Sequence, residues 1–137
     1  WRMEYYTQCC GFLAEYLTRR GLIVVISDLY DEPDNIIAGL KALKAKGNDI
    51  IVFHIMDNFE LTFPFEDMAQ FEDMETKRKL HVIPEYLRKQ YLTILNEHMD
   101  RIRKELSGTR IDYCLMDTSK PLDAGLFTYL AARSKST

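Results

Sequence analysis

Three short apolar runs, each followed by an aspartate, constrain the fold of this chain most strongly. The runs are Leu22–Ile26, Ile50–Met56 and Ile111–Met116, and the first two are rich in valine and isoleucine. Continuous apolar runs of this length are typical of strands buried on both faces of a parallel sheet. Parallel strands need right-handed crossover connections, and helix-like sequence separates the runs. We therefore expect an α/β fold with three parallel core strands and helices on both faces of the sheet.

Four segments carry apolar residues at the three- and four-residue spacing of amphipathic helices. Glycine or proline stands at most of their ends, as is common at helix boundaries. A β-hairpin is predicted within Phe71–Ile83, where two short alternating runs flank a turn. The stretch 57–70 has aromatic and proline residues without a helical period, which predicts a loop with extended pieces. The four predicted helices are Arg2–Arg19, Asp34–Lys46, Pro84–Gly108 and Leu122–Arg133.

The bulk properties describe an ordinary globular domain. The chain has 137 residues, of which 47% are hydrophobic and 28% charged, and this length fits a single domain spanning residues 1–137. A net charge of −3 gives no electrostatic reason to expect binding to nucleic acid, which depends on phosphate neutralisation. We expect no membrane insertion, since no apolar stretch is long enough. Three cysteines are too few for a disulfide framework and suggest a reducing, cytoplasmic compartment.

The aspartates after the three runs are the main candidate site residues. The carboxyl ends of parallel strands meet at one rim of the sheet, where ligands usually bind. Asp28, preceded by Ser27, would share this rim with Asp57 and Asp117. Oxygen clusters of this kind suit Mg²⁺, but aspartate and serine also cap helices and turns. The sequence leaves both roles open for these residues, whereas the acids that follow Asp28 are better explained as helix-start residues.

No catalytic machinery is apparent in the sequence. There is no G-x-S-x-G nucleophile turn and no glycine-rich phosphate loop. His54 lies inside a predicted buried strand, so we expect a hydrogen-bonded core histidine there. We therefore assign no catalytic residue and expect a protein that is not an enzyme.

Several sequence motifs together resemble one bacterial family. They are VVISDLYDEP, VFHIMD, FPF, FEDMET and IDYCLMDTSKPLDAGLFTYLAAR, and they extend from about Gly21 to Arg133. This combination resembles the carboxyl-terminal part of the domain-of-unknown-function 58 proteins. Those proteins carry a von Willebrand factor A-like domain and are often encoded beside MoxR-type AAA+ ATPases. The resemblance implies a partial von Willebrand factor A-like, Rossmann-like three-layer sandwich, with the predicted hairpin as an insertion.

The resemblance also implies an incomplete metal-ion-dependent adhesion site. Asp28 matches the later aspartate of that site, but the D-x-S-x-S motif and the strands that would carry it are absent from this sequence. We therefore expect the chain to be the C-terminal portion of a longer domain, binding Mg²⁺ or Mn²⁺ weakly through Asp28. The strand at Leu22–Ile26 would then be an open edge. We expect either that two copies pair through it as a homodimer or that the first helix covers it.

These observations favour a non-enzymatic protein-binding or scaffold module that recognises its partner at the carboxyl rim. By the resemblance, the partner is a MoxR-type ATPase or a client protein. Phe59, Phe63 and Phe65 form a second candidate partner surface. The alternative function is a Mg²⁺-dependent phosphatase or hydrolase that uses the rim aspartates, with Lys120 nearby.

Overall fold

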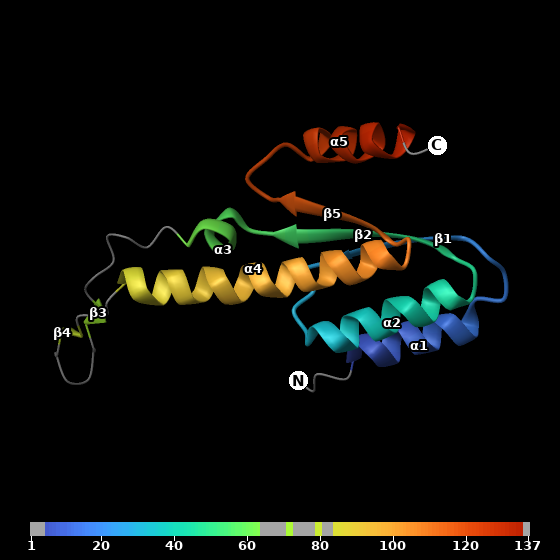
Figure 1. Ribbon diagram of the computed structural model, residues 1–137, viewed down its shortest axis with the longest axis horizontal. Coiled ribbons are helices and arrows are strands. Elements are labelled where there is room, and N and C mark those ends of the chain that lie inside the picture. The colour runs from blue at the N-terminus through green and yellow to red at the C-terminus, as the bar shows by residue number, and fades with distance from the viewer. Residues whose placement is uncertain (1–4, 64–70, 73–78, 81–83, 136–137) are drawn as a thin grey trace.

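A parallel three-stranded sheet forms the centre of the molecule (Figure 1). The computed structural model describes residues 5–63, 71–72, 79–80 and 84–135. The sheet has the order β1-β2-β5, and both neighbouring pairs are parallel. The strands are β1 (Leu22–Ser27), β2 (Asp49–Met56) and β5 (Asp112–Asp117). The predicted three-stranded parallel core is therefore confirmed.

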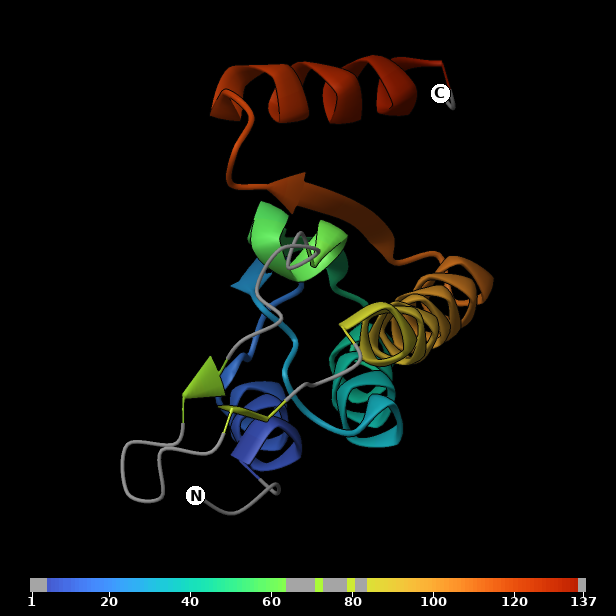
Figure 2. The same cartoon turned by 90° about the vertical axis from the view of Figure 1, so that its left-hand side faces the viewer.

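Helices lie on both faces of this sheet, as predicted, and form a three-layer α/β sandwich (Figures 1 and 2). One face packs against three helices, α1 (Tyr5–Tyr16), α2 (Pro33–Ala45) and α4 (Pro84–Gly108). Among the described residues, the other face carries α5 alone (Leu122–Ser134), where the ring of Tyr129 meets the ring of Phe53 edge-on at 5.6 Å between centroids. We call the first the inner face and the second the outer face.

Local sequence signals explain where α2 begins and ends. Pro33 fits the first turn because its missing N–H is not needed there. Asp34 in the first turn and Lys44 in the last complement the helix dipole. Gly47 adopts a left-handed φ of 88°, which glycine tolerates best and which turns the chain towards β2. Buried Asn48 joins this turn to β1, since its amide donates to Leu43 O at 2.9 Å and accepts from Gly21 N at 3.1 Å.

The hydrophobic core fills the space between the inner face and its three helices. Each helix contributes fully or nearly fully buried side chains, and β2 supplies the centre of the sheet. Burial of apolar area is the dominant favourable contribution to folding. The buried members of this cluster are Cys10, Ala14, Leu29, Ile36, Leu40, Leu43, Ile50, Val52, Ile102, Leu106 and Ile111.

The outer face of β1 differs from the prediction that this strand is buried on both sides. Leu22, Val24 and Ile26 are 59%, 47% and 69% exposed. Helix α5 packs over β5 and β2 and leaves these three side chains uncovered. Helix α1 packs against α2 and the inner core, so it does not shift to cover them.

Two predictions for the segment after β2 have different outcomes. The predicted loop is wrong at its start, because α3 (Asn58–Thr62) is a short helix that begins with a capping box between Asp57 and Glu60. The predicted hairpin is confirmed in its described residues, β3 (Phe71–Glu72) and β4 (Lys79–Leu80), which pair antiparallel. Residues 64–70, which include Phe65, lie outside the described residues.

No helix within the described residues is long and apolar enough to cross a membrane. The three cysteines are free thiols: Cys10 is buried, Cys114 is half-buried and Cys9 is exposed.

Candidate functional site

The carboxyl rim of the sheet begins with the turn that follows β1. The Ser27 hydroxyl accepts a hydrogen bond from Leu29 N at 3.0 Å, and Asp28 Oδ1 accepts one from Tyr30 N at 3.2 Å. Both side chains therefore satisfy backbone amides of a tight turn, as serine and aspartate often do. These hydrogen bonds stabilise a turn in which buried Leu29 has a left-handed φ of 50°. That conformation is unfavourable for a bulky residue.

The other two rim aspartates also accept hydrogen bonds from the residues that follow them. Asp57 Oδ1 accepts from Phe59 N at 2.8 Å and begins α3. Asp117 Oδ1 accepts from both the amide and the hydroxyl of Ser119, at 2.9 and 2.7 Å. These two hydrogen bonds hold the pKa of Asp117 below its usual value. The capping role that the sequence left open is thus present at all three aspartates.

The structure brings Asp57 and the β5 turn together but places Asp28 elsewhere on the rim. Thr118 donates to Asp57 Oδ2 at 3.2 Å, which links the ends of β2 and β5. Asp28 follows β1, on the opposite side of β2 in the sheet order. Within the described part of the chain, no group of three or more His, Cys, Asp or Glu side chains could hold a metal ion. The weak divalent-cation site at Asp28 stays a prediction.

His54 of β2 binds the backbone of the turn that follows β1. It is fully buried, with Nδ1 2.7 Å from the Tyr113 hydroxyl and Nε2 2.9 Å from the carbonyl oxygen of Asp28. A carbonyl only accepts, so Nε2 carries the proton and Nδ1 accepts from Tyr113. Burial lowers the pKa of His54 and keeps the ring neutral. The predicted hydrogen-bonded core histidine is confirmed.

A second histidine holds the same turn from α4. His98 Nε2 lies 3.3 Å from the carbonyl oxygen of Leu29, one residue beyond the carbonyl that His54 contacts. Two histidines from different elements thus fix two successive carbonyls of the strained turn. No pattern in the sequence indicates this contact, which joins residues 69 positions apart.

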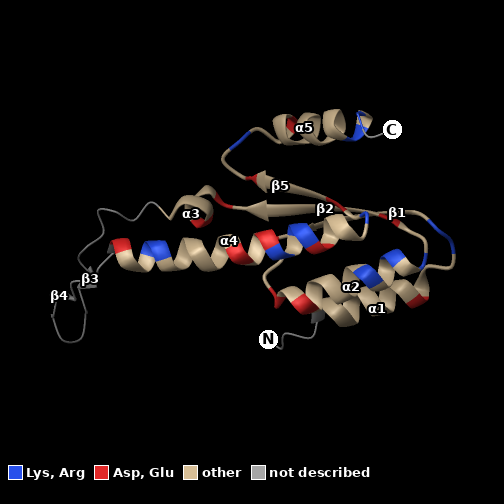
Figure 3. Ribbon diagram, in the orientation of Figure 1, with Lys and Arg blue, Asp and Glu red and all other residues tan. Residues whose placement is uncertain are grey.

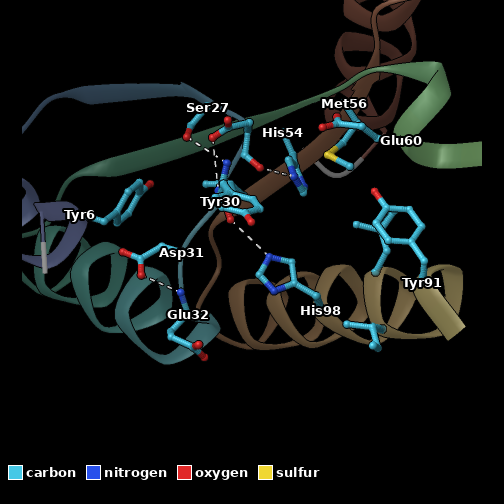
Figure 4. Close-up of a pocket in the computed structure, with 14 residues that line it drawn as sticks. Tyr6, Ser27, Tyr30, Asp31, Glu32, His54, Met56, Glu60, Tyr91 and His98 are labelled. Carbon is cyan, nitrogen blue, oxygen red and sulfur yellow. Dashed lines mark hydrogen bonds between the residues drawn. The ribbon is translucent and has the colours of Figure 1, made fainter. Parts of the chain in front are cut away.

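A cavity of about 850 Å³ opens beside this turn (Figure 4). Its walls come from α1, the β1–α2 turn, the end of β2, α3 and α4. Sequence analysis identified Ser27, Asp28 and His54 but missed the cavity itself, because its lining is drawn from segments far apart in the chain. The lining residues are Tyr6, Ser27, Asp28, Leu29, Tyr30, Asp31, Glu32, His54, Met56, Glu60, Tyr91, Ile94, Leu95 and His98.

The predicted aromatic surface has a mixed outcome within the described residues. Phe59 on α3 is 61% exposed and accessible to a partner. Phe63 packs against Tyr91 of α4, with ring centroids 4.9 Å apart, so its ring contributes to the fold. Tyr30, which the sequence did not single out, is 95% exposed in the β1–α2 turn. Tyr30 and Phe59 therefore present aromatic side chains next to the rim.

Comparison with known families supports the resemblance seen in the sequence. The family model described as "Protein of unknown function DUF58" matches residues 5–101, which is more than half of the chain. The chain belongs to the DUF58 family. No curated protein and no solved structure matches it. The von Willebrand factor A-like relationship, the link to MoxR-type ATPases and the assignment as the C-terminal portion of a longer domain stay predictions.

Proposed function

We propose that this DUF58 chain is a non-enzymatic protein-binding module of the von Willebrand factor A-like type, which acts in the cytoplasm with a MoxR-type AAA+ ATPase or its client. The exposed aromatic pair at the carboxyl rim, Tyr30 and Phe59, carries the proposal. Tyrosine and phenylalanine are enriched at protein interfaces because they bury much apolar area at low entropic cost. The ATPase enters through the sequence resemblance.

The rim can be tested directly with a MoxR-type ATPase. We expect the chain to bind the ATPase in biolayer interferometry, and Tyr30→Ser with Phe59→Ser to weaken binding at least tenfold, since interface anchors contribute about 2 kcal/mol or more. Phe127→Ser is the control, because Phe127 is also an exposed aromatic residue but lies within α5 and not in a turn that follows a strand. Equal loss in both variants, or no binding by the unchanged chain, would contradict the proposal.

A weak divalent cation at Asp28 belongs to the same proposal. One carboxylate without neighbouring ligand side chains binds Mg²⁺ or Mn²⁺ only loosely, so a partner's acidic side chain would complete the coordination. Isothermal titration calorimetry with each ion should give weak, saturable heat that disappears in Asp28→Ala. Absence of heat, both alone and with the ATPase present, would remove the cation from the account.

A second copy of the chain is the proposed occupant of the open edge of β1. The backbone of Gly21 faces β2, because its carbonyl oxygen accepts a hydrogen bond from Asp49 N at 2.9 Å. Successive residues of a strand direct their backbone N–H and C=O groups to opposite sides. The backbone groups of Leu22, Val24 and Ile26 therefore point away from β2 and towards the open edge. Their side chains are also the ones exposed on the outer face. Such an edge with apolar side chains favours pairing with another strand.

Charge supports antiparallel pairing of two β1 strands. Arg19 and Arg20 precede β1, whereas acidic residues follow it from Asp28 onwards. Figure 3 shows basic residues in the loop before β1 and acidic residues at the start of α2. A two-fold axis would place the basic end of each strand beside the acidic end of the other, which favours this partner and this direction.

The alternative function, a Mg²⁺-dependent phosphatase or hydrolase, requires several rim aspartates on one metal. Asp28, Asp57 and Asp117 each accept hydrogen bonds from their own turns instead. Turnover of p-nitrophenyl phosphate with Mg²⁺, lost in Asp28→Ala, would favour this alternative over the binding module.

A further inference from the structure

The cavity beside the β1 turn has the size and the walls of a small-molecule site. Its volume of about 850 Å³ lies within the usual range for pockets that enclose drug-sized ligands, about 300–1,000 Å³. Leu29, Met56, Ile94 and Leu95 supply aliphatic wall from the turn, β2 and α4. An apolar body of moderate size can therefore be buried here.

The polar part of the lining is strongly acidic. Four carboxyl residues line the cavity, Asp28, Asp31, Glu32 and Glu60, and none of the described lining residues is lysine or arginine. His54 adds no positive charge, because its hydrogen bonds to Asp28 O and the Tyr113 hydroxyl fix the neutral ring. A cationic group entering this cavity would meet a negative field strengthened by the apolar wall.

Three tyrosines complete the cavity. Figure 4 shows Tyr6 and Tyr91 on opposite sides of the lining residues, with Tyr30 between them. The faces of such rings attract ammonium and guanidinium groups. The Tyr6 hydroxyl is buried and has no hydrogen-bond partner among the described residues. A buried hydroxyl without a partner is costly, so a ligand that offers it one gains affinity.

A bare metal ion fits this lining less well than an organic cation. Mg²⁺ needs several oxygen ligands at about 2.1 Å in octahedral geometry. The described residues contain no group of three His, Cys, Asp or Glu side chains able to hold a metal. The acids are instead spread around an apolar cavity, as a cation with a hydrophobic body requires.

We propose that this cavity binds a small organic cation, an ammonium or guanidinium group attached to an apolar or aromatic body. The charged group contacts the carboxylates and tyrosine rings, and the body packs against the aliphatic wall. This site shares Asp28 and Tyr30 with the proposed rim contact, but it does not involve the exposed side chains of β1. Its ligand is either a free small molecule or a basic side chain of a peptide, and both offer the same chemistry.

Three probes that share a phenethyl body and differ in the charge of the end group test the proposal. Phenethylamine is cationic at pH 7, 3-phenylpropionate is anionic and 2-phenylethanol is neutral. We expect calorimetry or ligand-observed NMR to show phenethylamine binding at least tenfold tighter than the other two, and weakening as salt is added. No binding of phenethylamine, or equal binding of the alcohol or acid, would overturn the proposal. Acetyl-Phe-Arg-amide binding tighter than phenethylamine would identify a peptide side chain as the source, and weaker binding a free small molecule.

Two isosteric variants place the probe in the cavity. Tyr6→Phe removes only the unpartnered hydroxyl, so it should raise the melting temperature yet weaken phenethylamine binding about threefold or more. Asp31→Asn with Glu60→Gln keeps the hydrogen-bond acceptors of both side chains and should weaken binding about tenfold. Glu97→Gln on α4, outside the lining, is the matched control. Unchanged affinity in both cavity variants, with the fold verified by circular dichroism, would overturn the assignment.

Discussion

Strands β1 and β2 are adjacent and similarly apolar, yet they are buried to very different extents. β2 is central, and its side chains pack against helices on both faces. Within the part of the chain that the structure describes, β1 pairs with β2 alone, and its outer side chains are exposed. Apolar, β-branched sequence thus determined that both segments are strands, whereas burial was determined by what the rest of the chain places beside them.

The exposed side of β1 could contribute binding free energy if a second strand covered it. Fully burying a leucine, valine or isoleucine stabilises by about 1.5–3 kcal/mol relative to leaving it exposed. Three such side chains on one strand, beside an open row of backbone donors and acceptors, offer a second strand both apolar area and hydrogen bonds. This is why the contrast between β1 and β2 has a functional meaning.

The largest expected effect compares a leucine of the inner core with one on the outer face. Leu40→Ala removes a fully buried side chain of α2 and should lower the free energy of unfolding by about 2–5 kcal/mol. Leu22→Ala on β1 should lower it by about 0.5 kcal/mol or less, as surface substitutions usually do. Urea denaturation followed by circular dichroism measures both. In protein dilute enough to be monomeric, comparable losses would mean that the outer face is covered within a single copy.

A smaller but better matched comparison uses two strand valines. Val52→Thr buries a hydroxyl in the core of β2, where it should cost about 1–3 kcal/mol. Val24→Thr places the same hydroxyl on the exposed face of β1 and should change stability by about 0.5 kcal/mol or less. The same urea titration applies, because the two substitutions change the side chain identically. A costly Val24→Thr in dilute protein would count against an open β1.

The buried histidine predicts how stability depends on pH. His54 has a lowered pKa in the folded state because of burial, so below about pH 6.5 the unfolded chain binds the extra proton. Stability should therefore fall as pH decreases, by up to about 1.4 kcal/mol per pH unit. Unfolding measured between pH 7.5 and 5.5 should show a shallower slope in His54→Asn than in His98→Asn, which tests the role of His54 itself. Equal slopes would contradict it.

The sequence predicted the elements well where apolar periodicity was regular. The three strands, the long helix to Gly108 and the closing helix lie within one or two residues of their predicted bounds. Helix α3 was missed, although Asp57 and Glu60 form a capping-box pattern, because the aromatic residues around them obscured the helical period. Periodicity reports strongly amphipathic segments and is weak for a helix of this length.

The site was predictable only in part. Asp28 follows a predicted strand, and the structure has it in the turn at the carboxyl end of β1. His54 lies inside a predicted buried strand, and the structure has it in the core. The contact of His98 with the β1 turn and the buried hydroxyl of Tyr6 depend on tertiary packing across long sequence separations. No local pattern encodes such contacts, so the cavity that they surround emerged only from the fold.

Sedimentation equilibrium of the chain most directly tests whether the open side of β1 is an interface. We predict concentration-dependent association of the unchanged chain, which Val24→Lys abolishes because it places a charge at the centre of the edge. Gln90→Lys adds the same charge to exposed α4 and should associate like the unchanged chain. A chain that stays monomeric at every concentration, or a Val24→Lys variant that associates normally, would contradict the account.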